Sequence, residues 1–269
     1  MIKKVLERLG PNKEPLHLYK WNVWLAGLHA VQGLAILVLS ANGGIAITTS
    51  YLTTDALASA TSGHGVLAVA TKQLFTINVA YLVAAFFFIA AIVHALAATK
   101  CRTQYDAGIK KGVSYFRWIE YGLSSGVMLI TIALLVGVRD AASLAMIFAF
   151  ALIAGLLGLA LEIYSQNKGI ALWVLYAAKC AAGIMPWIVL AKYVGGMMLY
   201  GSGKLPGYVY AVLAAMAVLF GCFTIAKYLQ HQKKGRWADY VYSEQAYMMW
   251  SLVTKTVLAW IIFVGTLRP

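Results

Sequence analysis

Residues 248–263 read MMWSLVTKTVLAWIIF, an apolar run of membrane-spanning character with a single lysine, Lys255, in its middle. A protonated lysine at the centre of a bilayer costs about 2.5–3.5 kcal/mol on insertion scales. Its side chain cannot reach the polar region beyond either end of the run, because Ser243 and Gly265 lie about 18 and 15 Å away along a helix. Lys255 therefore needs either a buried carboxylate partner or a covalent reaction of its amine, such as condensation with an aldehyde.

The whole chain has the composition of a membrane protein. Its 269 residues are 62% hydrophobic and 12% charged, whereas roughly a quarter of a soluble domain is charged. The net charge of +13 comes from basic residues beside apolar segments, which predicts contact with a lipid membrane and not with nucleic acid. The cysteines Cys101, Cys180 and Cys222 show no metal-ligand or disulfide spacing, and no catalytic set is apparent. We therefore expect neither a metal site nor an enzyme.

Seven apolar segments are long enough to cross about 30 Å of hydrocarbon. Together they predict an all-α membrane protein, a single seven-helix bundle that occupies residues 1–269. Of the 22 Lys and Arg residues, 15 fall on the side of the N-terminus and 5 on the other side. This bias predicts a multi-pass protein of the cell membrane with a cytoplasmic N-terminus and an extracellular C-terminus. The predicted helices span 21–41, 74–98, 115–137, 142–163, 170–192, 208–230 and 241–265.

The first extracellular loop, residues 43–72, is long and carries two stretches rich in β-branched residues, 45–52 and 66–71. A turn sequence, Gly63-His64-Gly65, separates them, which predicts a β-hairpin lying over the outer face of the bundle. Because an isolated hairpin is only marginally stable, we expect it to pack on the bundle or on a neighbouring subunit.

Glu120 lies about five residues inside the third predicted helix. It is either the counterion of a buried cation or an interfacial carboxylate that pairs with Arg117, three residues earlier. Ser124 and Met128 continue the same helix face inward, which favours a buried counterion. Ser251 precedes Lys255 by four residues, so its hydroxyl lies on the lysine's face of the helix.

Polar residues inside the other helices gather in the cytoplasmic half. His29, with Gln32 three residues later, and His94 together predict a polar pocket that accepts a proton, although each histidine taken alone is more often an ordinary packing residue. The outer half holds no matching carboxylates, which argues against proton transport across the membrane. Lys179 is a second buried lysine and a weaker candidate for covalent chemistry.

The fifth predicted helix contains Pro186-Trp187. The proline is expected to break and kink the helix at mid-depth and to leave a large flat ring beside the freed carbonyl. Phe220 in the sixth helix would complete an apolar slot for a cofactor. The alternative is a chance cluster, since 13% of the chain is aromatic.

Seven helices, a lysine in the middle of the last one and an acid early in the third are the arrangement of a retinal protein. Residues 117–121 (RWIEY), 183–187 (GIMPW), 251–255 (SLVTK) and 258–260 (LAW) resemble those of the heliorhodopsins, distant relatives of the pumping microbial rhodopsins. The inverted topology and the strand-containing first loop resemble that family as well. Outward proton pumps carry a second carboxylate eleven residues after the counterion, where this chain has Thr131.

The resemblance implies a set of residue roles. Lys255 would carry all-trans retinal as a protonated Schiff base, Glu120 would be its single counterion and Ser251 would tune the nitrogen. Tyr121 would lie beside the counterion, while His29, Gln32 and His94 would line the proton-accepting cavity. The other residues expected around the cofactor are Ser124, Ser125, Met128, Pro186, Trp187 and Phe220.

The resemblance also implies a function. Light would isomerise retinal, and the Schiff-base proton would leave and return on the cytoplasmic side without net ion transport. The slow photocycle would suit signalling by a homodimeric photoreceptor to an unknown cytoplasmic partner. Two alternatives stay open: a light-driven ion pump or channel, and a seven-helix transporter or receptor without retinal, in which Lys255 is ion-paired.

Overall fold

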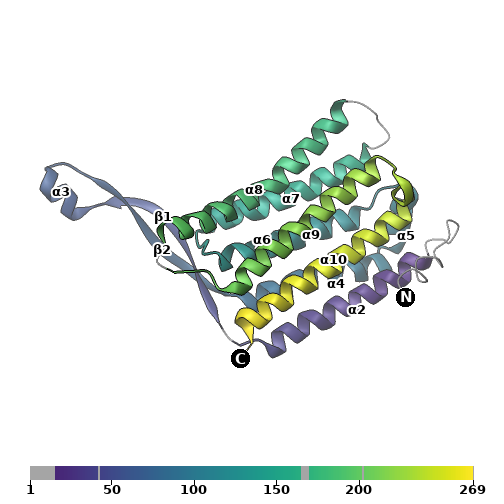
Figure 1. Cartoon of the computed structure of the whole chain (residues 1–269), viewed down its shortest axis with the longest axis horizontal. Helices are drawn as coiled ribbons and strands as arrows, with labels where there is room; N and C mark the ends of the chain where they lie inside the picture. Colours follow the sequence, from purple (N-terminus) through teal and green to yellow (C-terminus); the bar gives the residue numbers. More distant parts are fainter. Residues whose placement is uncertain (1–15, 42, 165–169, 202, 269) are drawn as a thin grey trace.

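The computed structural model describes residues 16–41, 43–164, 170–201 and 203–268, with side chains from Leu18 onward. In this part of the chain, seven helices are long and apolar enough to cross a membrane. They run side by side in one bundle, and a two-stranded hairpin projects from one end (Figure 1). We call this the hairpin end and the opposite end, where the short helix α5 lies, the α5 end.

The predicted seven-helix bundle is confirmed. Asn78, Asp140 and Asp239 begin three of the helices, since the side chain of each accepts a hydrogen bond of 2.9 Å from a first-turn backbone N–H. A π-helical turn, Phe263–Leu267, continues the last helix. The seven helices are α2 (Leu16–Leu39), α4 (Val79–Ala98), α6 (Tyr115–Leu135), α7 (Ala141–Ile163), α8 (Ile170–Tyr200), α9 (Gly207–His231) and α10 (Tyr240–Ile262).

The predicted hairpin is also confirmed, with longer strands than expected. Strand β1 (Gly44–Thr54) pairs antiparallel with β2 (Leu67–Asn78), and the short helix α3 (Ala56–Ser62) forms the tip. The prediction that residues 74–78 begin the second transmembrane helix is wrong. These residues pair with β1 through Ile77 and Ile45, and the helix begins only after Asn78, because the side chain of that residue caps it.

Only the base of the hairpin lies against the bundle. The backbone N–H of Thr48 donates to the carbonyl of Arg139 at 2.9 Å, which ties β1 to the connection between α6 and α7. Beyond this point the hairpin extends away from the helices (Figure 1) and does not lie over the outer face as expected. The cross-strand partners Leu52 and Val69 are 65% and 71% exposed, so the distal half of the hairpin has an uncovered apolar surface.

Two other segments differ from the prediction. The predicted helix 170–192 continues to Tyr200, and α8 is one uninterrupted helix through Pro186, so the proline does not break it. The basic connection after α4 contains α5 (Arg102–Lys110), and a short 3-10 helix, η1 (Gly235–Ala238), precedes α10. Both short helices cover the α5 end of the bundle (Figure 1).

Helix α10 lies inside the bundle, where it contacts α2, α4, α6 and α9. Leu258 and Ile262 on α10 are fully buried, together with Ile132 on α6 and Met216 on α9. An apolar helix packed on several sides holds its few polar side chains away from lipid. Lys255 is therefore a side chain of the protein interior.

Candidate functional site

Lys255 and Glu120 form a buried ion pair. The Lys255 ammonium nitrogen lies 2.7 Å from Glu120 Oε1, and the exposed fractions of the two side chains are 3% and 7%. Lys255 also donates to Ser251 Oγ at 2.5 Å, and Ser124 donates to Glu120 Oε1 at 2.9 Å. Of the two partners considered for Glu120, the structure thus selects the lysine and not Arg117. These hydrogen bonds offset part of the cost of burying a charge pair.

Two histidines stack beside this pair. His29 and His94 are buried, their ring centroids lie 5.7 Å apart, and their planes differ by 7°. His94 Nδ1 lies 2.8 Å from Asn22 Oδ1. Among the described residues, neither ring nitrogen of His29 nor Nε2 of His94 has a hydrogen-bond partner. Unpaired buried nitrogens of this kind are able to bind water or accept a proton.

Gln32 lies apart from the histidines with which it was grouped. Its side-chain oxygen accepts hydrogen bonds from Thr256 Oγ1 at 3.0 Å and Trp260 Nε1 at 3.4 Å. Both donors follow Lys255 on α10, so Gln32 is on the hairpin side of the lysine. The spacing of three residues between His29 and Gln32 did not reveal that their side chains face different helices. Gln32 packs against α10, whereas His29 stacks on His94 of α4.

The other predicted cofactor residues fall into two groups. Tyr121 packs against Phe223 at 5.4 Å between ring centroids, and it lines the same cavity as Glu120. In the other group, the rings of Trp187 and Phe220 meet edge to face at 5.8 Å and pack against the main apolar core. Met128 belongs to that core, and Ser125 and Pro186 are buried.

The sequence did not predict a second network of buried charges, near the α5 end. Arg117 pairs with both Glu162 and Glu244, its contact with Glu244 Oε2 measuring 2.6 Å. Lys227 also pairs with Glu162, at 3.1 Å. Tyr105 donates to Glu244 at 3.1 Å, and burial and the Glu244 carboxylate raise the pKa of the Tyr105 phenol well above its ordinary value. This tyrosine therefore stays protonated and remains a donor.

A signal for this network was present in the sequence. Glu162 and Glu244 fall within predicted spans, where a carboxylate requires a partner. Arg117 and Lys227 were counted among the surface charges that set the orientation, but both are buried. Their removal from the count leaves the basic excess on the same side of the bundle.

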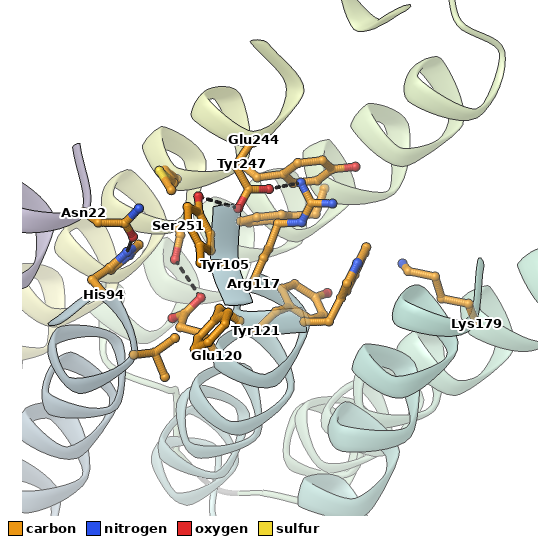
Figure 2. A pocket seen from close by; sticks show the side chains of 15 residues that line it. Asn22, His94, Tyr105, Arg117, Glu120, Tyr121, Lys179, Glu244, Tyr247 and Ser251 are labelled. Carbon is orange, nitrogen blue, oxygen red and sulfur yellow. Dashed lines mark hydrogen bonds and ion pairs between the residues drawn. The ribbon is translucent and has the colours of Figure 1, made fainter. Parts of the chain in front are cut away.

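A small cavity separates the two charge networks. Figure 2 shows its wall: Asn22 and His94 lie on one side, Glu120 and Ser251 are near the middle, and Lys179 points inward from α8 on the other side. It provides about 30 Å³ for the centres of water-sized particles. The cavity thus connects the Glu120 carboxylate and His94 to the Arg117 network.

The surroundings of Lys255 fit an aldehyde cofactor with a long apolar chain. The primary amine is buried, one carboxylate balances its charge, and Trp187, Phe220 and Met128 provide flat or flexible apolar surface. No group of three or more possible metal ligands occurs among the described residues. The buried amine with its single carboxylate partner suits an organic cofactor bound at a lysine.

Comparison with solved structures identifies the fold. The light-driven proton pump LR (Mac) from Leptosphaeria maculans aligns with 92% of this chain and 95% of its own, at a TM-score of 0.60 and 17% identity. The light-driven proton pump rhodopsin CsR from Coccomyxa subellipsoidea aligns with 94% and 98%, at a TM-score of 0.63 and 18% identity. At such identities the similarity shows the fold alone. No curated protein sequence gives a significant match.

Comparison with protein families assigns the chain. The heliorhodopsin family matches residues 18–267, which include all seven transmembrane helices and the hairpin. The expected resemblance is confirmed over nearly the whole chain, and the family implies a retinal chromophore and a photoreceptor function. The protein belongs to the heliorhodopsin family, within the microbial rhodopsin superfamily, and is a multi-pass membrane protein.

Proposed function

We propose that this heliorhodopsin is a light sensor that binds all-trans retinal at Lys255 and moves a proton only within the cytoplasmic half of the bundle, with no net ion transport. The observation that carries the proposal is the buried Lys255–Glu120 pair, whose titratable neighbours among the described residues, His29 and His94, belong to the cytoplasmic half. Retinal, when bound, supplies a chromophore whose isomerisation by light redirects the proton on the lysine nitrogen.

The chain's own residues hold and receive that proton. Glu120 balances the positive charge at Lys255 Nζ, and the hydroxyls of Ser124 and Ser251 orient its carboxylate. The unpaired ring nitrogens of His29 and His94 are the acceptors on the α5 side. Since the cavity is lined by His94, Glu120 and Ser251 together, the proton has a short route between these groups.

The hairpin side of Lys255 offers no comparable route. Asp55 and Asp140 are the acidic residues there, and each caps a helix with its carboxylate. Thr131, at the position of the second carboxylate of outward pumps, donates to its own helix at Val127. Transport would require titratable groups on both sides of the lysine. This asymmetry supports a sensor.

The orientation and partners belong to the same proposal. The α5 end would face the cytoplasm, because exposed basic residues gather there. That surface suits an acidic partner protein, still unidentified, or anionic lipid. On the opposite side, the apolar half of the hairpin would cover a second copy of the chain, giving a homodimer. The exposed basic residues at this end include Lys110, Lys111, Lys233, Lys234 and Arg236.

Reconstitution tests the pigment. Addition of all-trans retinal to the purified protein should produce a visible absorption band that is absent in Lys255→Ala and strongly shifted in Glu120→Gln. Borohydride reduction followed by mass spectrometry should place a retinyl group on Lys255. A colourless wild-type protein, or a lysine without the adduct, would favour a seven-helix transporter or receptor without retinal.

Illumination tests the absence of transport. Cells that contain the pigment, in weakly buffered medium, should show no sustained pH change that an uncoupler abolishes, and no photocurrent. Replacement of His29 or His94 by phenylalanine should slow the light-induced loss of the proton in flash spectroscopy. A sustained pH change would instead indicate a pump.

A further inference from the structure

Lys179 is a buried cation to which the light-sensing mechanism assigns no role. It lies on α8, is 4% exposed, and directs its ammonium group into the cavity between the charge networks (Figure 2). Among the described residues, no carboxylate lies within ion-pair distance of Lys179. Its Nζ lies 5.9 Å from the centroid of the Trp118 ring, a cation–π contact. An ammonium group in this position requires an acceptor or must lose its proton.

A second cationic donor in the same wall also lacks an acceptor. Arg117 uses its two terminal nitrogens for Glu162 and Glu244, whereas its Nε–H is buried without a hydrogen-bond partner among the described residues. The Arg117 guanidinium lies 5.2 Å from the centroid of Trp118, the ring that Lys179 also approaches. Two unsatisfied cationic donors thus lie within 6 Å of one ring in the wall of the same cavity.

The buried charges are out of balance by one. Lys255 is matched by Glu120, and the network at the α5 end combines Arg117 and Lys227 with two carboxylates. Lys179 is the remaining cation among the described buried side chains. A single monovalent anion would neutralise the set, and it would satisfy both donors at once.

The size of the cavity suits a small anion. About 30 Å³ open to water-sized particles exceeds the 10–15 Å³ or so that one water needs, so the cavity has room for a small ion. Tyr121 lies in the same wall and offers a hydroxyl donor. The lining also includes the carboxylates of Glu120 and Glu244, but each is already paired, with Lys255 and Arg117 respectively. Lys179 is therefore the charged group left to bind a halide.

We propose that this cavity is a binding site for one small monovalent inorganic anion, of which chloride is the biological example, held by Lys179 and by the Nε–H of Arg117. The site lies at the α8 side of the cavity, whose middle holds the Glu120 that pairs with Lys255, and it does not depend on retinal. It places a negative charge on the α8 side of the cavity, where it stabilises the bundle independently of light.

Isothermal titration calorimetry on the retinal-free full-length protein in detergent tests this proposal. The protein is kept at constant ionic strength in sodium gluconate and titrated with sodium chloride. We expect saturable binding of about one chloride per chain. Lys179→Met should weaken binding about a hundredfold, as loss of a buried charge partner does. Lys192→Met, at an exposed lysine of the same helix, should leave binding unchanged, and Lys179→Arg should retain it.

The thermal unfolding midpoint gives a second readout. The midpoint of the wild-type protein should rise when chloride replaces gluconate, whereas that of Lys179→Met should be the same in both salts. Wild-type protein that takes up no chloride, or Lys179→Met protein that binds it like the wild type, overturns the proposal. Because retinal is absent, either result leaves the light-sensing proposal to its own tests.

Discussion

The ion pairs at the α5 end should contribute strongly to stability, and Arg117→Met measures that contribution. Glu244 has a side chain 1% exposed, and Arg117 is its cationic partner, at 2.6 Å. Without Arg117, the carboxylate retains hydrogen bonds from Ser114 and Tyr105 but no compensating charge. Removal of one partner from a buried pair costs about 3–5 kcal/mol. We expect the free energy of unfolding to fall by that amount.

Denaturant titration of the purified protein in micelles, followed by circular dichroism, provides the measurement. Arg102→Met is the matched control, because its pair with Asp106 is exposed and 3.7 Å long; such pairs are worth about 0.5 kcal/mol or less. The double variant Arg117→Met/Glu244→Gln should recover much of the loss, since it removes the uncompensated charge. Equal losses in Arg117→Met and Arg102→Met would refute the role assigned to this network.

Two further predictions concern packing and assembly. A Cβ at Gly158 would overlap the buried ring of Trp118, so Gly158→Ala should lower the free energy of unfolding by about 1–3 kcal/mol. As a control, Gly221→Ala should be neutral or stabilising, because the added Cβ meets no atom within 4 Å. Equal denaturation midpoints for the two variants would contradict the packing argument. Val69→Lys, on the exposed strand surface, should convert the proposed homodimer to monomer in native mass spectrometry, whereas Leu57→Lys at the hairpin tip should not. A dimer that survives Val69→Lys would exclude this surface as the interface.

The transmembrane helices and the importance of Lys255 followed from sequence because the bilayer acts on each segment locally. An apolar run of sufficient length is a span wherever it occurs, and a lysine in its middle is costly wherever the neighbouring helices lie. The pairing of Glu120 with Lys255 was within reach for the same reason, since few charged side chains occupy the spans. The boundary at Asn78 was not, because strand pairing with β1 overrode the apolar pattern of residues 74–77.

The tertiary structure alone decided which side chains meet between helices. Arg117 finds Glu162 and Glu244, 45 and 127 residues away in sequence, because α6, α7 and α10 turn these side chains toward one another. Likewise, Gln32 points to α10 and Lys179 points into the cavity, although sequence alone left the partners of both unassigned. Sequence shows which polar groups lie within the membrane, since burial depth follows from position along a span. Their partners depend on the rotation and neighbours of each helix, which only packing fixes.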